Sequence, residues 1–117
     1  MQTTTHTLDA TGKKLGRLGS EAARLLMGKN STAFVRNAAP DVEVVITNAS
    51  KLDIPLRKLS QEMKSRFSGF PSGIKTPTVG LTIAKKGKSE LLRIAIRGML
   101  PHNKLRAEML RNLTISE

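Results

Sequence analysis

Residues 42–47, with the sequence Val-Glu-Val-Val-Ile-Thr, restrict the possible folds of this chain more than any other segment. All but one of these residues are β-branched, which is typical of a strand, and the nearly apolar run predicts a strand covered on both faces. A short strand is expected earlier, at residues 7–10. Between the two strands, apolar residues recur with a helical period at Leu15, Leu18, Ala22, Leu25 and Leu26. A strand, a helix and a buried strand in this order predict an α/β unit with parallel strands.

The rest of the chain alternates loops with short helical patterns. The predicted features are a helix end at Gly28, loops over 29–40 and 68–73, helices over 78–86 and 89–97 broken at Gly87, and a last helix capped by Asn103. Residues 56–67 have helical spacing but are ambiguous. No repeat or linker divides the chain and its length suits one domain, so residues 1–117 are expected to form a single domain.

The charge of the chain indicates its class of partner. Twenty Lys and Arg against nine Asp and Glu give a net charge of +11, of which residues 57–117 carry +9. Excess charge of one sign destabilises a compact fold, so neutralisation by a polyanion is expected, and nucleic acid is the usual one. The alternative is a basic surface that only maintains solubility. With three Phe and no Trp or Tyr, the chain has little to stack bases on, which favours folded nucleic acid held through phosphates, sugars and shape.

The sequence gives little support for an enzyme. It has no Cys and only two His, far apart, and its carboxylates are scattered among Lys and Arg, so no catalytic residues, metal site or cofactor are expected. The glycine-bearing turn over 11–17 could cradle a phosphate, but it lacks the P-loop pattern, and contact with nucleic-acid phosphates is the preferred interpretation. The N-terminus has no secretory pattern and no stretch is long and apolar enough for a membrane span, which favours the cytoplasm.

Two segments are candidates for nucleic-acid contact. In the loop around Phe70, two glycines allow close approach of the backbone, and cations flank it at Lys64, Arg66 and Lys75. The alternative there is an ordinary surface turn. Farther on, Arg97, Lys104 and Arg111 are spaced by seven, which on a continuous helix would make a basic stripe. Pro101 interrupts that helix, and a solvated face explains the spacing equally well.

Several segments together resemble the L13 family of large-subunit ribosomal proteins, bacterial type. They are Asp9–Lys13 with Leu15–Leu18, Glu21–Arg24 with Gly28 and Lys29, Asn48–Lys51, Ser68–Lys75, and Ala95–Pro101 followed by Lys104, Leu105 and Met109. The chain departs from the family pattern at Phe67, usually His, at Ser72, usually Gly, and at His102 and Asn103, where Lys and Gly are usual. It also has a short N-terminal lead and ends without the usual C-terminal tail.

The resemblance implies a three-layer α/β/α fold around a mostly parallel sheet of about four strands, with an extended strand over 58–67. It implies a structural, non-catalytic protein of the cytoplasmic ribosome that binds large-subunit rRNA early in assembly and contacts neighbouring large-subunit proteins. Neither a membrane nor a small-molecule substrate is expected. A regulatory role in binding messenger RNA stays open. The rival hypotheses are a general basic DNA-binding protein, without preference for rRNA, and a nucleotide-dependent enzyme, which would bind a mononucleotide saturably.

The predicted rRNA-binding residues are of two kinds. Phosphate contacts are expected from Lys13, Lys14, Arg17, Lys29, Lys64, Arg66, Lys75, Arg97 and Lys104. Contacts through backbone or packing are expected from Ser68, Gly69, Phe70, Gly73, Gly98, Met99 and Pro101. Among these, Gly69 and Gly73 are expected to let the backbone approach RNA, and Phe70 to pack against a ribose or base. Specificity is expected to come mainly from RNA shape.

Overall fold

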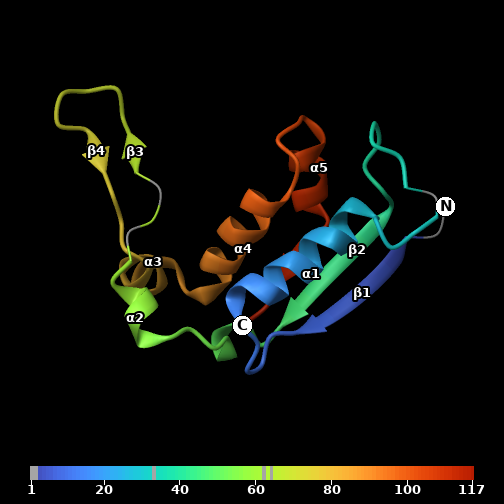
Figure 1. Ribbon diagram of the computed structural model, residues 1–117, viewed down its shortest axis with the longest axis horizontal. Coiled ribbons are helices and arrows are strands. Elements are labelled where there is room, and N and C mark those ends of the chain that lie inside the picture. The colour runs from blue at the N-terminus through green and yellow to red at the C-terminus, as the bar shows by residue number, and fades with distance from the viewer. Residues whose placement is uncertain (1–2, 33, 62, 64) are drawn as a thin grey trace.

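A parallel sheet with helices packed against it forms the body of the molecule (Figure 1). A computed structural model describes residues 3–32, 34–61, 63 and 65–117. The sheet contains β1 (Thr4–Asp9), β2 (Val42–Thr47) and β5 (Leu113–Ile115). The helices are α1 (Leu15–Met27), α2 (Leu56–Leu59), α3 (Val79–Lys86), α4 (Lys88–Met99) and α5 (Leu105–Arg111), with a short 3-10 helix η1 (Ala49–Lys51) after β2. A separate antiparallel hairpin consists of β3 (Arg66–Phe67) and β4 (Ile74–Lys75).

Strand β2 lies in the centre of the sheet, with β1 on one side and β5 on the other. Both pairings are parallel, with Leu8 opposite Ile46 and Val44 opposite Leu113. Helix α1 connects the first two strands. The predicted strand–helix–strand unit with parallel strands is therefore confirmed, and the α/β class with it.

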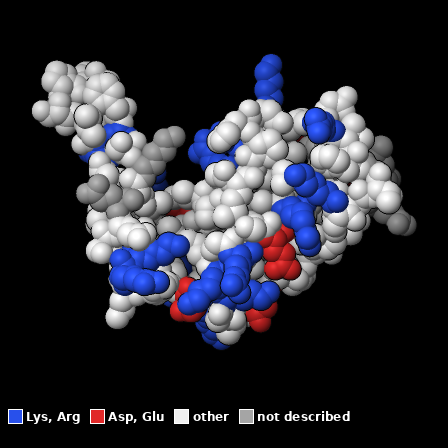
Figure 2. All heavy atoms as spheres, in the orientation of Figure 1, with Lys and Arg blue, Asp and Glu red and all other residues white. Residues whose placement is uncertain are grey.

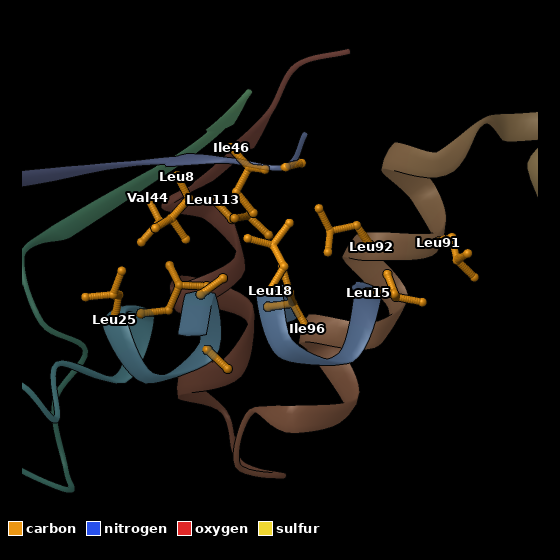
Figure 3. Close-up of a cluster of buried hydrophobic side chains, with 14 of the residues drawn as sticks. Leu8, Leu15, Leu18, Leu25, Val44, Ile46, Leu91, Leu92, Ile96 and Leu113 are labelled. Atoms are coloured by element: carbon orange, nitrogen blue, oxygen red, sulfur yellow. The ribbon is translucent and has the colours of Figure 1, made fainter. Parts of the chain in front are cut away.

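One face of the sheet is buried. Leu8, Val44, Ile46 and Leu113 point into a core that side chains of α1 and α4 complete (Figure 3). The alternate residues of the strands form a polar second face, on which Thr5, Thr7, Asp9, Glu43 and Thr114 are exposed. Such alternation is expected for a sheet that is covered on one side only.

Two expectations about the sheet are therefore corrected. Among the described residues the sheet has three strands, not about four, and no helix covers its polar face to make the third layer of an α/β/α arrangement. The prediction that β2 is covered on both faces is also wrong. Val45 and Thr47 are only half-buried, because a central strand is shielded by its two neighbours even without a second layer.

Helix α1 begins and ends as its sequence predicts. Gly28 adopts the left-handed conformation (φ 75°), and its N–H donates to the carbonyls of Arg24 and Leu25, as glycine commonly does at a helix C-terminus. Inside the helix, Gly19 is buried against α4, where an added Cβ would lie 3.3 Å from the sulfur of Met99. This glycine allows α1 and α4 to approach closely.

The C-terminal half departs from the expected elements in two places. Among the described residues of 58–67, where an extended strand was expected, strand structure is found at Arg66–Phe67, while residues 56–59 are helical. Leu113 does not continue the face of the last helix but begins β5. The break at Gly87 is confirmed by its φ of 85°. The N-cap of α5 is Lys104 and not the predicted Asn103, which lies one position earlier and accepts from the Arg106 N–H through its side-chain oxygen at 3.2 Å.

The hairpin extends from the body as an arm, which we define as residues 65–77 (Figure 1). Two backbone hydrogen bonds anchor its base, from Met63 N–H to the Pro77 carbonyl (2.8 Å) and from Val79 N–H to the Gln61 carbonyl (3.0 Å). The arm explains why the radius of gyration is 15.5 Å, against about 13 Å for a compact domain of this length. Among the described helices, none has the length and apolar character to cross a membrane.

Candidate nucleic-acid interface

Positive charge on the described surface is mostly unpaired. The ion pairs found among the described residues are Lys13–Glu21, at 3.9 Å, and Lys14–Asp53. Both lie at the start of α1, so two of the predicted phosphate contacts already have carboxylate partners. Figure 2 shows Lys and Arg side chains spread over one face of the molecule with few acidic groups among them. The other described cations are therefore more available to an external polyanion than Lys13 and Lys14.

The segment around Asp9 and the segment around Asn48, which both carry the family resemblance, are bonded to each other. One carboxylate oxygen of Asp9 accepts from the Thr11 N–H (3.0 Å), the Thr11 hydroxyl (2.8 Å) and the Asn48 side-chain amide (3.2 Å). Asn48 itself is in the left-handed conformation (φ 57°). These bonds join the turn after β1 to the turn after β2, so the two motifs have a structural role at this edge of the sheet.

The same bonds make Asp9 unusually acidic. Hydrogen bonds from the Thr11 N–H, the Thr11 hydroxyl and the Asn48 amide lower the pKa of Asp9 from 3.8 to about 2, with a smaller contribution from nearby Lys13. A lowered pKa in the folded state stabilises the fold at every pH above the ordinary value of 3.8. This stabilisation is expected to disappear as the pH falls from about 4 to about 2. An NMR titration of the Asp9 carboxyl carbon tests this, and a midpoint near 3.8 would contradict it.

The first three residues of the turn over 11–17 have their N–H groups in hydrogen bonds. The N–H groups of Thr11, Gly12 and Lys13 donate to Asp9, the Lys51 carbonyl and the Ala10 carbonyl respectively. A loop that cradles a phosphate needs such N–H groups to be free. Their occupation argues against a nucleotide site here. In the described part of the chain, no three His, Asp or Glu side chains lie close enough together to hold a metal ion.

The arm has two different faces. Arg66 lies opposite Lys75 and Phe67 lies opposite Ile74, and successive side chains of a strand point to opposite sides. Arg66 and Lys75 line the hollow between the arm and the body, whereas Phe67 and Ile74 are 67% and 68% exposed. The tip adds Phe70, which is 73% exposed. The arm therefore presents cations at its base, toward the body, and apolar groups at its tip.

The glycines of the arm differ in what they do. At Gly73, an added Cβ would lie 2.0 Å from the Ser68 hydroxyl and 2.9 Å from the Phe70 carbonyl, so this glycine is needed for the turn itself. At Gly69 the corresponding space is open, but its φ of 89° favours glycine. Ser72 holds a φ of 63°, which explains why the family pattern has glycine there. Gly73 was predicted to let the backbone approach RNA closely. The geometry of the turn gives another reason for glycine at this position.

Some residues of the segment 97–104 pack against the body, and others are exposed on the surface. Met99 packs on Gly19, and the Ser20 hydroxyl lies 3.7 Å from its sulfur, so its main contact is with α1. Gly98 faces open space, and Pro101 and Lys104 are exposed. Arg97 lies on α4 and Arg111 on α5, so the spacing by seven does not form one continuous stripe.

The structure brings some of the predicted contacts together and separates others. Arg66, Lys75, Arg97 and Gly98 line one hollow between the arm and helices α3 and α4. Arg17 and Lys29 are exposed near opposite ends of α1, away from that hollow. Lys64 lies outside the described residues. Sequence reasoning missed three cations of the same hollow, Lys85, Lys86 and Arg106. The only indication of these residues in the sequence was the concentration of positive charge in the second half of the chain.

Comparison with known proteins identifies the family. Residues 3–117 match the profile of the family described as Ribosomal protein L13. The chain is 39% identical over 112 residues to the large ribosomal subunit protein uL13 of Dehalococcoides mccartyi, covering 96% of this chain and 78% of that protein. It is 41% identical to uL13 of Geobacter sulfurreducens over 108 residues, 92% of this chain and 75% of that protein. The family resemblance is thereby confirmed: the chain belongs to the L13 family of ribosomal proteins.

Proposed function

We propose that this chain is a structural, non-catalytic component of the large ribosomal subunit in the cytoplasm, and that it binds large-subunit rRNA early in assembly. Family membership supports the ribosomal role, since the relatives bear the name large ribosomal subunit protein. The observation that carries the RNA-binding part is the set of cations around the arm, α3 and α4 that have no carboxylate partner among the described residues. Neighbouring large-subunit proteins are the expected protein partners.

In the proposed mechanism the protein binds the RNA through phosphate contacts rather than through contacts to base edges. Cations such as Lys75 on the arm, Arg17 on α1 and Arg97 on α4 would contact phosphates, which fix the protein on RNA without reading its sequence. Because few aromatic side chains are available, the fold of the RNA would supply most of the specificity. The protein would in turn hold RNA segments at fixed separations, since the body and the arm present cations from different elements.

Competition binding separates this function from its rivals. Labelled large-subunit rRNA, transcribed in vitro, is bound to the protein and challenged with unlabelled rRNA, duplex DNA of the same length, a messenger RNA leader or a mononucleotide. We expect only the rRNA to compete efficiently. Equal competition by DNA would favour a general DNA-binding protein, and competition by the leader would reveal regulatory messenger RNA binding. Saturable mononucleotide binding would revive the enzyme hypothesis.

Phe70 provides a prediction that does not depend on charge. The ring is 73% exposed at the tip of the arm, where residues 67–74 carry no charge. If it packs on a ribose or base, Phe70→Ala is expected to weaken rRNA binding by about 1–3 kcal/mol, the range for base–aromatic contacts, without changing the salt dependence. The matched control is Phe34→Ala, because Phe34 is also exposed but lies outside the arm. Equal effects of both substitutions would remove the tip from the interface.

A further inference from the structure

A groove lies between the arm and the body of the molecule. It consists of two cavities, of about 490 Å³ and about 440 Å³. They share the lining residues Arg66, Pro77, Thr82 and Ile94, so they adjoin one another between the base of the arm, α3 and α4. We call the two cavities together the arm groove. In Figure 2 it is visible as the recess between the projecting arm and the rest of the molecule.

Cations from five different elements converge on the arm groove. They are Arg66 of β3, Lys75 of β4, Lys85 and Lys86 of α3, Arg97 of α4 and Arg106 of α5. The carboxylate found among the lining residues is Glu90, and no lining cation has an ion pair with a described residue. The guanidinium of Arg106 lies 2.7 Å from the Nδ1 of His102, and no described carboxylate pairs with it. Six cations and one carboxylate among the described lining residues leave an excess of positive charge. Such an excess destabilises the free protein, and a bound polyanion would relieve the repulsion.

Lys88 shows that a lysine close to the groove can instead be bonded within the fold. Lys88 follows Lys86 by two residues, but its ammonium donates to the carbonyls of Ser50 and Leu52, both at 3.1 Å. It therefore holds α4 against the end of η1. Lys85 and Lys86 make no such bond with a described residue and remain exposed in the last turn of α3. The fold uses one of the three neighbouring lysines internally and leaves two for an external ligand.

The uncharged lining of the groove narrows the class of ligand. Pro77, Leu81 and Ile94 provide apolar surface between the cations, and Leu81 is 44% exposed. A free inorganic anion would gain nothing from this surface. A sugar–phosphate chain combines regularly spaced anions with apolar sugar and base surfaces, so it matches both parts of the lining. At Gly98, where an added Cβ would meet no atom within 4 Å, the backbone of α4 is open to close contact.

We propose that the arm groove binds a segment of RNA backbone, with phosphates on the six cations and a ribose or base on the apolar lining. The inference rests on the proposed function and deepens it, because it assigns the main electrostatic contact to one groove. It also adds Lys85, Lys86 and Arg106 to the binding residues. The cations at the start of α1 then make a secondary contribution.

A charge-matched pair of double variants tests the groove. Lys85→Ala with Lys86→Ala removes two groove cations, and Arg24→Ala with Lys51→Ala removes two exposed cations of α1 and η1 that lie outside it. Binding to large-subunit rRNA is measured by filter retention over a series of salt concentrations. The groove variant is expected to bind roughly 10- to 100-fold more weakly at about 0.1 M salt and to lose about 2 from the magnitude of the log–log salt slope. The control variant is expected to keep the wild-type slope.

Each outcome has a distinct meaning. Circular dichroism and thermal melting of both variants establish that they are folded, which is expected because all four side chains are exposed. If wild type binds rRNA and the two variants lose affinity equally, the groove has no special role and the inference is wrong, although the proposed function stands. If wild type shows no preference for rRNA over duplex DNA, the proposed function itself fails. Competition by polyphosphate as strong as by RNA of equal charge would overturn the role of the apolar lining.

Discussion

Replacing Leu18 by Ala is expected to lower the free energy of unfolding by about 2–5 kcal/mol. Leu18 is 1% exposed and lies at the point where α1 meets the sheet and α4 (Figure 3). Truncation would leave a cavity between three elements that are fixed by their own hydrogen bonds, so the site can collapse only partly. Since the free energy of unfolding of a domain is only about 5–15 kcal/mol, a loss of this size removes a large part of the stability. Urea denaturation followed by circular dichroism measures the change.

Leu56→Ala is the matched control for this prediction. It removes the same atoms from a side chain that is 84% exposed, so its effect is expected to stay within about 0.5 kcal/mol. The two variants therefore separate burial from the chemistry of the substitution. Equal losses of stability, or a loss below about 1 kcal/mol for Leu18→Ala, would contradict the assignment of the core.

The affinity for large-subunit rRNA is expected to fall about a thousandfold when the salt concentration rises from about 50 to 200 mM. Neutralising about six phosphates gives a log–log slope near −5, and the arm groove offers six cations, Arg66, Lys75, Lys85, Lys86, Arg97 and Arg106. Titrations of rRNA binding at several salt concentrations give the slope directly.

A shallow slope would overturn this account of binding. Complexes held mainly by apolar or neutral contacts change little with salt, whereas release of counterions from phosphates always produces a steep dependence. A slope between 0 and about −2 would mean that two phosphates at most are neutralised. The unpaired cations of the groove would then have no role in RNA binding, and contacts such as that of Phe70 would have to dominate.

The parts of the fold that were predictable are those with strong local signals. The apolar stripe of α1, its end at Gly28 and the β-branched strand β2 are all where the sequence places them. Strand β5 was missed because Leu113 stands four residues after Met109, which is also helical spacing, and a strand of three residues has no period of its own. The number of layers was predicted wrongly because a central strand can have the same apolar sequence whether or not a helix layer covers its second face.

The candidate site was predictable only in part, because its residues meet through tertiary structure. Glycine and proline marked the arm, and the neighbouring cations Arg66 and Lys75 were found with it. Lys85 and Lys86 stand ten residues farther along, on a helix without any motif, and only the folded structure shows that they line a cavity with Arg66 and Lys75. Conversely, Lys14 was predicted from its motif alone, and its pairing with Asp53 could not be seen in the sequence.

Sedimentation of the tagged chain from a cell lysate tests the central claim most directly. The lysate is separated on a sucrose gradient, with washes of increasing salt, and the fractions are probed for the tag and for large-subunit rRNA. We predict that the chain migrates with the large subunit and stays there at moderate salt, since the assembled particle would hold it by many contacts at once. Migration at the top of the gradient, or together with DNA, would contradict the assignment to the large subunit.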